Sequence, residues 1–157
     1  MQKKYYIAYG SNLNMKQMKM RCPGAEVMGT AALKDWELLF KGSKTGSYLT
    51  VEPRTGSTVP VVVWKITPED EKALDRYEGY PNFYYKKKFK VLCKSIETGV
   101  SKYVNTFAYI MHEERAIGIP TCAYMSACLE GYKSFRFDKS TLMEAYEKSL
   151  EVCRNEK

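Results

Sequence analysis

The sequence predicts an α+β domain whose β-sheet curls or closes on itself. Three observations lead to this prediction. Strand-like segments dominate the first two thirds of the 157-residue chain, helical patterns flank and follow them, and no repeat, low-complexity tract or linker divides the chain. Because a chain of this length suits one hydrophobic core, we expect a single domain over residues 1–157.

Seven strand-like segments are separated by clusters of Gly, Pro, Ser and Asn. Each is rich in β-branched and aromatic residues or alternates between apolar and polar positions. They cover residues 4–9, 26–34, 36–41, 49–52, 59–66, 83–94 and 103–111. A sheet of this many short strands is typical of domains in which the sheet curls or closes.

Four helical patterns interrupt or follow the strands: one that follows Asn14 and ends at Cys22, and others at about residues 68–77, 121–133 and 139–154. The second has clear boundaries, with Thr67 as N-cap, Pro68 at its first position and Gly79 just past its end. The last follows the cap candidate Asp138 and carries an apolar stripe. We expect that stripe to pack on the sheet.

The composition excludes several classes of protein. With 45% hydrophobic and 27% charged residues, the chain resembles neither a disordered tail nor a membrane protein. No run approaches 18 uncharged apolar residues, and the Met-Gln-Lys-Lys start lacks the apolar stretch of a signal peptide. We therefore expect a cytoplasmic protein without a membrane segment. The sequence leaves its oligomeric state open.

Cysteine and histidine usage argues against a metal site. The five cysteines are scattered and contain no C-x-x-C pair, which favours reduced, mostly buried thiols over a disulfide framework. His112 is the only histidine, which argues against a zinc site, and its turn-like context favours a structural or exposed role over a place in a serine–histidine–acid triad. Metal-free chemistry based on carboxylate and hydroxyl groups remains.

The net charge of +7 could reflect a nucleic-acid partner, an anionic substrate or a lysine-coated surface. The densest basic cluster, Lys86–Lys88, lies in an alternating strand pattern, where lysines also discourage edge pairing. Aromatic and basic residues are not interleaved there as in RNA-binding signatures. We therefore favour a solvated strand and expect no nucleic-acid partner.

The stretch Tyr9-Gly10-Ser11-Asn12-Leu13 ends a strand just before a helix. Its backbone N–H groups can point into one concavity, because Gly10 permits positive φ and a helix start has unpaired donors. Such a loop can hold an anion or a developing oxyanion. Gly-Ser-Asn is also ordinary turn chemistry, so the residues alone leave both interpretations open.

Glu78 is the candidate carboxylate. It lies at the C-terminal end of the predicted second helix, among Tyr77, Tyr80 and further aromatic residues. The helix dipole disfavours a negative charge there by roughly 0.3–1 kcal/mol, and aromatic burial adds a desolvation penalty. Both effects raise a carboxylate pKa toward the range useful for proton transfer. The alternative is an exposed glutamate at a frayed helix end, paired with Arg76.

A third stretch is Pro120-Thr121-Cys122-Ala123-Tyr124, which begins the third helix. Tyr124 lies one turn inside this helix and could aim its hydroxyl past the helix start. A tyrosine at such a position is more commonly part of the core.

Together these stretches resemble the γ-glutamylcyclotransferase family. The motifs that carry the resemblance are Tyr9–Leu13, the "LDRYEG" of Leu74–Gly79 and the helix start Pro120–Tyr124, in the family's order and spacing. The similarity includes "VVVWKIT" before the second helix and extends from the first strand to about Gly131. It implies a closed or nearly closed mixed β-barrel with short helices packed outside.

The resemblance also implies an activity: cyclisation of a small γ-glutamyl compound to 5-oxoproline, with release of an amine or amino acid and without a cofactor or metal. Glu78 would be the catalytic proton shuttle. The substrate-binding residues would be Tyr9, Gly10, Ser11, Asn12, Leu13, Tyr124 and either Tyr84 or Tyr85, of which Tyr84 is favoured. We expect the loop to border the largest polar-lined pocket, with Glu78 opening into the same cavity.

Two questions stay open at this level. Thr121 replaces the serine common in the family, and the pocket for the leaving amine does not align, so the substrate could release a free amino acid, a lysine side chain or an aminoglycoside. A second class of function is a non-catalytic member of the same fold that binds a small molecule or a partner protein.

Overall fold

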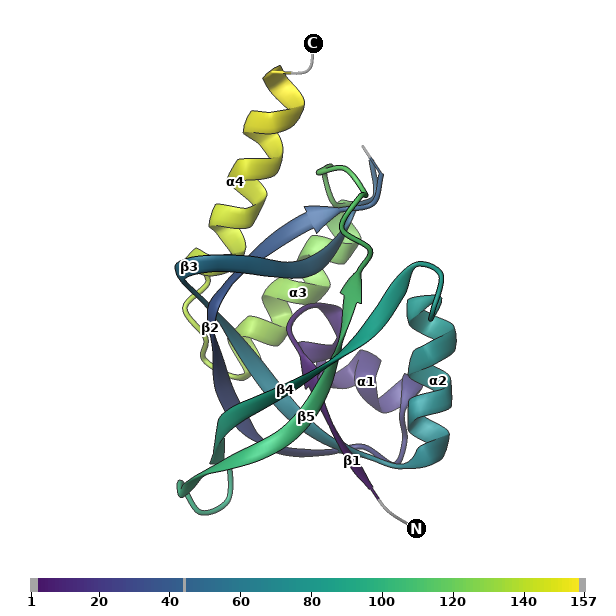
Figure 1. The fold of residues 1–157 in the computed structure, drawn as a ribbon, viewed down its shortest axis with the longest axis vertical. Coiled ribbons are helices and arrows are strands. Elements are labelled where there is room, and N and C mark those ends of the chain that lie inside the picture. Colours follow the sequence, from purple (N-terminus) through teal and green to yellow (C-terminus); the bar gives the residue numbers. More distant parts are fainter. Residues whose placement is uncertain (1–2, 44, 156–157) are drawn as a thin grey trace.

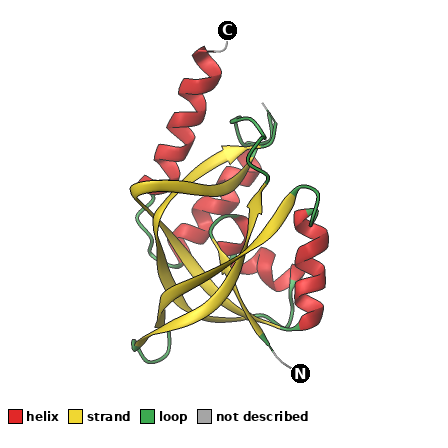
Figure 2. Ribbon diagram, viewed as in Figure 1, coloured by secondary structure: helices red, strands yellow, loops and turns green. Residues whose placement is uncertain are grey.

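The computed structural model describes residues 3–43 and 45–155, which form a closed β-barrel with helices around its outside (Figures 1 and 2). In chain order the elements are β1 (Lys4–Ala8), the 3₁₀ turn η1 (Ser11–Leu13), α1 (Met15–Arg21), β2 (Glu26–Lys41), β3 (Tyr48–Ile66), α2 (Pro68–Glu78), β4 (Tyr84–Ser95), β5 (Ser101–Met111), α3 (Cys122–Ser134) and α4 (Ser140–Asn155). The strand order around the barrel is β1-β3-β2-β4-β5.

The barrel closes through its first and last strands. β1 and β5 run parallel and meet where Tyr6 lies beside Phe107, whereas the other neighbouring strands are antiparallel. One parallel pair among antiparallel ones makes the barrel mixed. The predicted α+β fold, a closed mixed barrel with short helices packed outside, is therefore confirmed.

The prediction of seven strands is wrong in number, because β2 and β3 each unite two predicted segments. Their register shifts between Lys34 and Trp36, and residues 54–57 bulge out opposite Asp35. Asp35 has a φ of 66° and accepts a hydrogen bond from the Gly56 N–H at 3.0 Å. The gaps that the sequence predicts within β2 and within β3 thus fall on a β-bulge. At such a bulge the hydrogen-bond ladder is disrupted while the strand continues.

The helix boundaries agree with the sequence signals. In α2, Thr67 and Asp70 form a reciprocal capping box, Pro68 stands at the start and Gly79 takes the left-handed conformation at the end. Because α2 ends in this fixed way, Glu78 always occupies its last turn. Asp138 accepts a hydrogen bond from the Ser140 N–H at 2.9 Å, just before α4.

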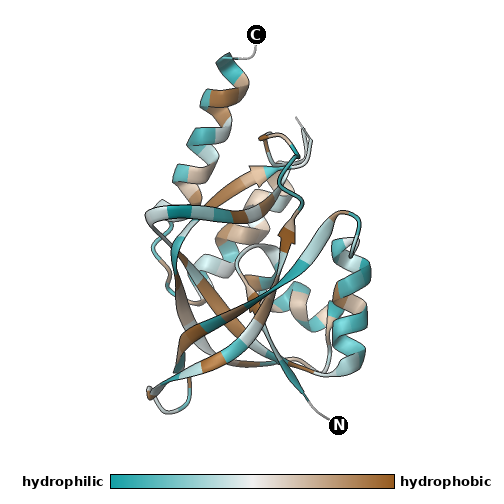
Figure 3. Ribbon diagram, viewed as in Figure 1, coloured by the Kyte–Doolittle hydropathy of each residue, from teal (hydrophilic) through white to brown (hydrophobic). Residues whose placement is uncertain are grey.

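The helices cover different parts of the barrel (Figure 1). Helices α1 and α2 lie on one side, α3 packs behind the N-terminal loop, and α4 leaves the barrel beside β2 and runs toward the C-terminus. In the apolar stripe of α4, Leu142 and Ala145 are buried. Apolar segments alternate with hydrophilic ones along the strands of the barrel, whereas α2 is mostly hydrophilic (Figure 3). The buried core includes Ile7, Phe40, Val61, Val63, Ile66, Leu74, Ile110 and Met111.

Cysteine burial follows the expectation for reduced thiols. All five cysteines are free, and Cys22, Cys93 and Cys128 are buried, whereas Cys122 is exposed. Within residues 3–43 and 45–155, no helix has both the length and the hydropathy needed to cross a bilayer.

Candidate active site

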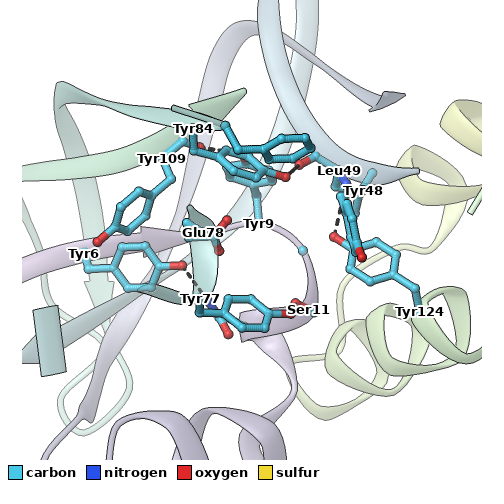
Figure 4. A pocket seen from close by; sticks show the side chains of 13 residues that line it. Tyr6, Tyr9, Ser11, Tyr48, Leu49, Tyr77, Glu78, Tyr84, Tyr109 and Tyr124 are labelled. Atoms are coloured by element: carbon cyan, nitrogen blue, oxygen red, sulfur yellow. Dashed lines mark hydrogen bonds between the residues drawn. The ribbon is translucent and has the colours of Figure 1, made fainter. Parts of the chain in front are cut away.

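A cavity of about 170 Å³ opens where the N-terminal loop, the end of α2 and the start of α3 meet (Figure 4). Aromatic side chains make up most of its wall. The lining consists of Tyr6, Tyr9, Gly10, Ser11, Asn12, Tyr48, Leu49, Tyr77, Glu78, Phe83, Tyr84, Tyr109 and Tyr124. Among these thirteen residues, only Glu78 is an acid or a base near neutral pH.

The structure brings most of the predicted site residues together. The loop from Tyr9 to Asn12, Glu78, Tyr84 and Tyr124 share this one cavity. Leu13 does not line it, because its fully buried side chain packs on Gly131 of α3. The expectation that this would be the largest polar-lined pocket is wrong, since a hollow of about 430 Å³ between the β2–β3 bulge and α4 has a greater volume.

The loop offers backbone donors, though not for the reason predicted. Gly10 has a φ of −130°, so the expectation of positive φ is wrong. The Leu13 N–H is already used, because it donates to the Gly10 carbonyl at 3.0 Å. No acceptor within the described residues takes the N–H groups of Gly10, Ser11 or Asn12. These three amides are therefore available to an anionic group in the cavity.

Close packing explains why residue 10 is a glycine. A Cβ there would lie 3.1 Å from the Tyr124 hydroxyl oxygen and 3.4 Å from Leu49. At the other end of the loop, a Cβ on Gly131 would lie 2.5 Å from that of Leu13. The loop is thus held between α3 on one side and Tyr124 and Leu49 on the other.

Asn14 ties the loop to two helices. Its side chain accepts a hydrogen bond from the Gln17 N–H at 3.1 Å and so caps α1. The same side chain donates to the Ala127 carbonyl of α3 at 3.2 Å. Because Asn14 is buried, these bonds fix where the loop ends and where α1 begins.

Glu78 has the raised pKa that its position predicts. Burial raises the pKa of its carboxyl group to about 8, against the opposing effect of the Arg21 guanidinium. Within the described residues, no hydrogen bond reaches this carboxyl group, which Figure 4 shows in the middle of the ring of tyrosines. A carboxyl group with this pKa can both take up and release a proton near neutral pH.

Hydrogen bonds hold three of the tyrosine rings in place. The Tyr9 hydroxyl donates to the Tyr109 carbonyl at 2.6 Å, and the Tyr84 hydroxyl donates to the Leu49 carbonyl at 2.8 Å. The Tyr124 hydroxyl accepts from the Leu49 N–H at 3.1 Å. Burial raises the pKa of all three phenols, so they remain neutral.

The structure distinguishes the two tyrosine candidates at the start of β4. Tyr84 lines the cavity, whereas Tyr85 lies outside it, donates to Glu113 and packs its ring against His112. Successive side chains of a strand point to opposite faces, so only one of the two can face the cavity.

Sequence reasoning missed several lining residues and one neighbour. The cavity also contains Tyr6, Tyr48, Leu49, Tyr77, Phe83 and Tyr109. Seven tyrosines line the cavity, and the high count of 13 in the chain was the available signal. Arg21 also escaped notice, although it stacks 3.6 Å from the centre of the Tyr77 ring. It stands at the end of a predicted helix, where nothing in the pattern indicates which way it points.

Comparison with known proteins now identifies the family. The family model described as gamma-glutamyl cyclotransferase, AIG2-like, matches residues 6–139. The chain belongs to this family. The match includes the loop, Glu78 and the start of α3, and hence every element that builds the cavity.

Relatives within the gamma-glutamyl cyclotransferase family support this placement. A human protein named gamma-glutamylcyclotransferase is 32% identical over 113 residues, which cover 68% of this chain and 58% of the human protein. The bovine protein of that name is 36% identical over 87 residues, covering 51% of this chain and 46% of its own length. The chain thus spans about half the length of these curated relatives.

Solved structures show the same fold. A structure titled gamma-glutamyl cyclotransferase superposes with a TM-score of 0.76 at 26% identity and covers 94% of this chain and 86% of that one. YkqA from Bacillus subtilis has a TM-score of 0.75 at 18% identity over 95% of this chain and 55% of its own length. This second likeness concerns the fold alone.

Proposed function

We propose that this protein cyclises a γ-glutamyl compound to 5-oxoproline and releases an amine or amino acid, with Glu78 as the proton shuttle. One observation carries the proposal. A carboxyl group with a pKa of about 8 shares a small cavity with three unused backbone amides. The names of the human and bovine relatives point to the same chemistry.

The reaction moves two protons from the attacking nitrogen to the departing one. The α-amino nitrogen of the substrate attacks its own γ-carbonyl carbon, a C–N bond forms, and the bond to the leaving nitrogen breaks. Glu78 takes one proton from the α-ammonium group before the attack and gives it to the departing nitrogen. The second proton, which the attacking nitrogen loses as it becomes the lactam N–H, ends on the released amine, so that no water or redox step is required. Because burial raises the pKa of Glu78 to about 8, its carboxylate is a much stronger base toward the α-ammonium group than an ordinary glutamate, and its protonated form can still release the proton near neutral pH.

The loop and the tyrosines would hold the substrate. The N–H groups of Gly10, Ser11 and Asn12 can donate to its carboxylate or to the oxygen that gains charge in the transition state. The fixed rings of Tyr9, Tyr84 and Tyr124 shape the cavity so that the γ-glutamyl chain must fold back. Well-oriented intramolecular reactions reach effective molarities of about 10⁵–10⁸ M, so this folding supplies much of the rate.

The identity of the leaving amine is left open by this proposal. A panel of γ-glutamyl amino acids, γ-glutamyl-lysine and γ-glutamyl aminoglycosides would distinguish the alternatives. A non-catalytic binding member of the fold is the second candidate, and failure to turn over any compound of the panel would favour it. The raised pKa of Glu78 favours catalysis, because a binding protein has no need of a titrating carboxyl group in its cavity.

The substitution Glu78→Gln tests the shuttle. Glutamine keeps the size and much of the hydrogen bonding of glutamate but does not exchange a proton. Because Glu78 would act in both attack and departure, we expect kcat to fall by about 10⁴-fold, near the upper end of the range for a general acid–base, with KM changed much less. Release of 5-oxoproline is the measurement.

The control is Glu69→Gln, in the first turn of the same helix and far from its C-terminal end. We expect it to retain the activity of the wild type. If Glu78→Gln turned over its best substrate within a few-fold of the wild type, another residue would have to carry the proton and this mechanism would be wrong.

A further inference from the structure

A chain of hydrogen bonds leads from the partly buried guanidinium of Arg21 into the cavity. Arg21 Nη1 donates to Asn12 Oδ1 at 2.5 Å, and Asn12 Nδ2 donates to the hydroxyl oxygen of Tyr6 at 2.9 Å. Asn12 and Tyr6 are only 3% and 4% exposed. The mechanism proposed above uses the backbone of Asn12 and none of these side chains.

The direction of this chain follows from the chemistry of arginine. A guanidinium group has donors and no acceptor, so the atom of Asn12 that it meets must be the amide oxygen. The amide nitrogen of Asn12 then faces Tyr6, and it can only donate. The Tyr6 oxygen is therefore an acceptor in this contact, and its own proton must point elsewhere.

Arg21 is itself held in place, so the chain has a fixed origin. Arg21 Nη2 donates to Gln17 Oε1 at 2.7 Å, one turn earlier in α1, and the guanidinium stacks on the Tyr77 ring. The backbone carbonyl of Asn12 accepts from Trp64 Nε1 at 3.1 Å. The amide of Asn12 is thus fixed at both its backbone and its side chain.

The free proton of Tyr6 faces the cavity. Figure 4 shows the Tyr6 hydroxyl directed toward the middle of the cavity that Glu78 also lines. No acceptor within the described residues takes this proton. Burial, followed by the charge of Glu78, raises the pKa of Tyr6 well above its usual value, so the group stays protonated. Tyr6 is therefore a neutral donor aimed at the place where substrate binds.

We propose that Tyr6 is a further catalytic residue, whose hydroxyl donates to the γ-carbonyl oxygen as that oxygen gains negative charge. Arg21 and Asn12 are positioning residues that hold the hydroxyl in this orientation. The inference rests on the function proposed above. Glu78 must reach both reacting nitrogens, and Tyr6 lines the same small cavity and feels the charge of Glu78, so the hydroxyl can meet the reacting end of the substrate. Chains of hydrogen bonds that start at a charge strengthen one another in a buried site.

Tyr6→Phe tests the catalytic part, because it removes one oxygen and keeps the ring packed against Phe107 and Tyr109. Loss of one oxyanion donor lowers kcat by roughly 10²–10³-fold, and we expect this loss with KM within a few-fold of the wild type. The matched control is Tyr132→Phe, since Tyr132 is similarly buried in α3, but its hydroxyl has no hydrogen-bond partner among the described residues and does not line the cavity. It should keep full activity.

A double-mutant cycle tests the positioning part. Arg21→Met leaves the side-chain amide of Asn12 free to rotate by half a turn and present its oxygen to Tyr6. The Tyr6 hydroxyl would then donate its proton to Asn12 instead of pointing into the cavity. We expect a loss of at least about 10-fold for Arg21→Met alone and almost none when it is added to Tyr6→Phe. Arg21→Lys keeps a donor-only group and should restore most of the activity. All rates are compared on the plateau of the pH profile, so that a changed pKa of Glu78 does not contribute.

The outcomes separate this inference from the proposed function. If the wild type released no 5-oxoproline from any compound of the panel, the proposed function and the role of Tyr6 would both be wrong. If the wild type were active and Tyr6→Phe kept kcat within a few-fold of it, the role of Tyr6 would be wrong and that of Glu78 would stand. If the losses of Arg21→Met and Tyr6→Phe multiplied in the double variant, Arg21 would act by another route and the positioning role would be wrong.

Discussion

At the scale of single residues, the site depends on how few charges surround Glu78. Tyrosines supply the wall of the cavity, and the phenols stay neutral because burial raises their pKa. A carboxyl group among neutral rings loses its hydration without gaining a counter-ion, which is what raises its pKa. Arg21, held by Asn12 and Gln17, moderates this effect from behind Tyr77.

Gly10→Val should weaken substrate binding through crowding. The Cβ position of residue 10 already lies 3.1 Å from the Tyr124 hydroxyl oxygen, so the two methyl groups of valine would displace Tyr124 and Leu49. We expect KM to rise at least about 10-fold, because the amides that would hold the substrate move with the loop.

Gly10→Ala provides the graded comparison for Gly10→Val, since a single Cβ needs only a small shift. Its KM should lie between those of the wild type and the valine variant. Thermal unfolding of each variant would separate loss of binding from loss of fold. A folded valine variant with unchanged KM would show that the loop is not part of the binding site.

At the scale of elements, the sequence predicts the helices better than the strands. Caps act through local hydrogen bonds, so Thr67, Pro68 and Gly79 define α2 and with it the position of Glu78. Strand continuity depends on the partner strand, and the bulge at Asp35 made two long strands look like four. The direction of a side chain across a barrel is equally non-local. For this reason the motifs predicted the loop, Glu78 and Tyr124, while Tyr6, Tyr109 and Arg21 emerged only from the structure.

An ion cluster fastens α2 to the barrel. Lys86 of β4 lies 2.7 Å from Glu71 and 2.9 Å from Asp75, and Asp75 accepts a hydrogen bond from the Tyr109 hydroxyl at 2.6 Å. Glu71 also pairs with Lys4 of β1 at 3.0 Å. The three lysines of the basic run therefore differ in their surroundings: Lys86 is paired with carboxylates, whereas Lys87 and Lys88 are exposed. Asp75 precedes Glu78 by one helical turn, so the cluster sets where Glu78 lies.

Lys86→Met should loosen this attachment. It leaves Glu71 and Asp75 without the cation between them, and because the side chains are partly exposed we expect a loss of roughly 1–2 kcal/mol in the free energy of unfolding at pH 7. Burial by itself raises the pKa of Glu71. The hydrogen bonds and charges of Lys86 and Lys4 together lower it by more, so the pKa of Glu71 lies below its usual value. That stabilisation is present at neutral pH and is lost as pH falls and the carboxyl group becomes protonated.

Urea unfolding of Lys86→Met at pH 7 and at about pH 3.5 would check this. The deficit relative to the wild type should shrink at the lower pH. Lys88→Met is the matched control, because Lys88 is exposed on the same strand, and it should change stability by less than about 0.5 kcal/mol. An equal deficit at both values of pH would mean that Lys86 stabilises through packing alone.

At the scale of the whole molecule, function and stability make opposite demands on the same carboxyl group. The barrel and the surrounding helices bury Glu78 without giving it a hydrogen-bond partner among the described residues, which suits proton transfer but costs stability once the group ionises. The closed sheet makes this arrangement possible, because β1, β4 and β5 each contribute a tyrosine to the wall opposite α2.

Glu78→Gln should therefore stabilise the fold in a pH-dependent way. The folded protein keeps the Glu78 proton up to about pH 8, whereas the unfolded chain loses it near the usual value of 4.5. The native state thus binds more protons between these values, and this carboxyl group's contribution to the free energy of unfolding falls as pH rises through that window. Glutamine does not titrate, so the stability of Glu78→Gln relative to the wild type should rise by roughly 1.4 kcal/mol per pH unit between about pH 5 and pH 8 and level off by pH 9. Urea unfolding at the three values of pH measures this, with Glu151→Gln on the exposed face of α4 as the control for net charge. A gain that was the same at pH 5 and pH 9 would mean that Glu78 titrates alike in the folded and unfolded states, and the carboxyl group would then be too acidic in the native protein to serve as the shuttle.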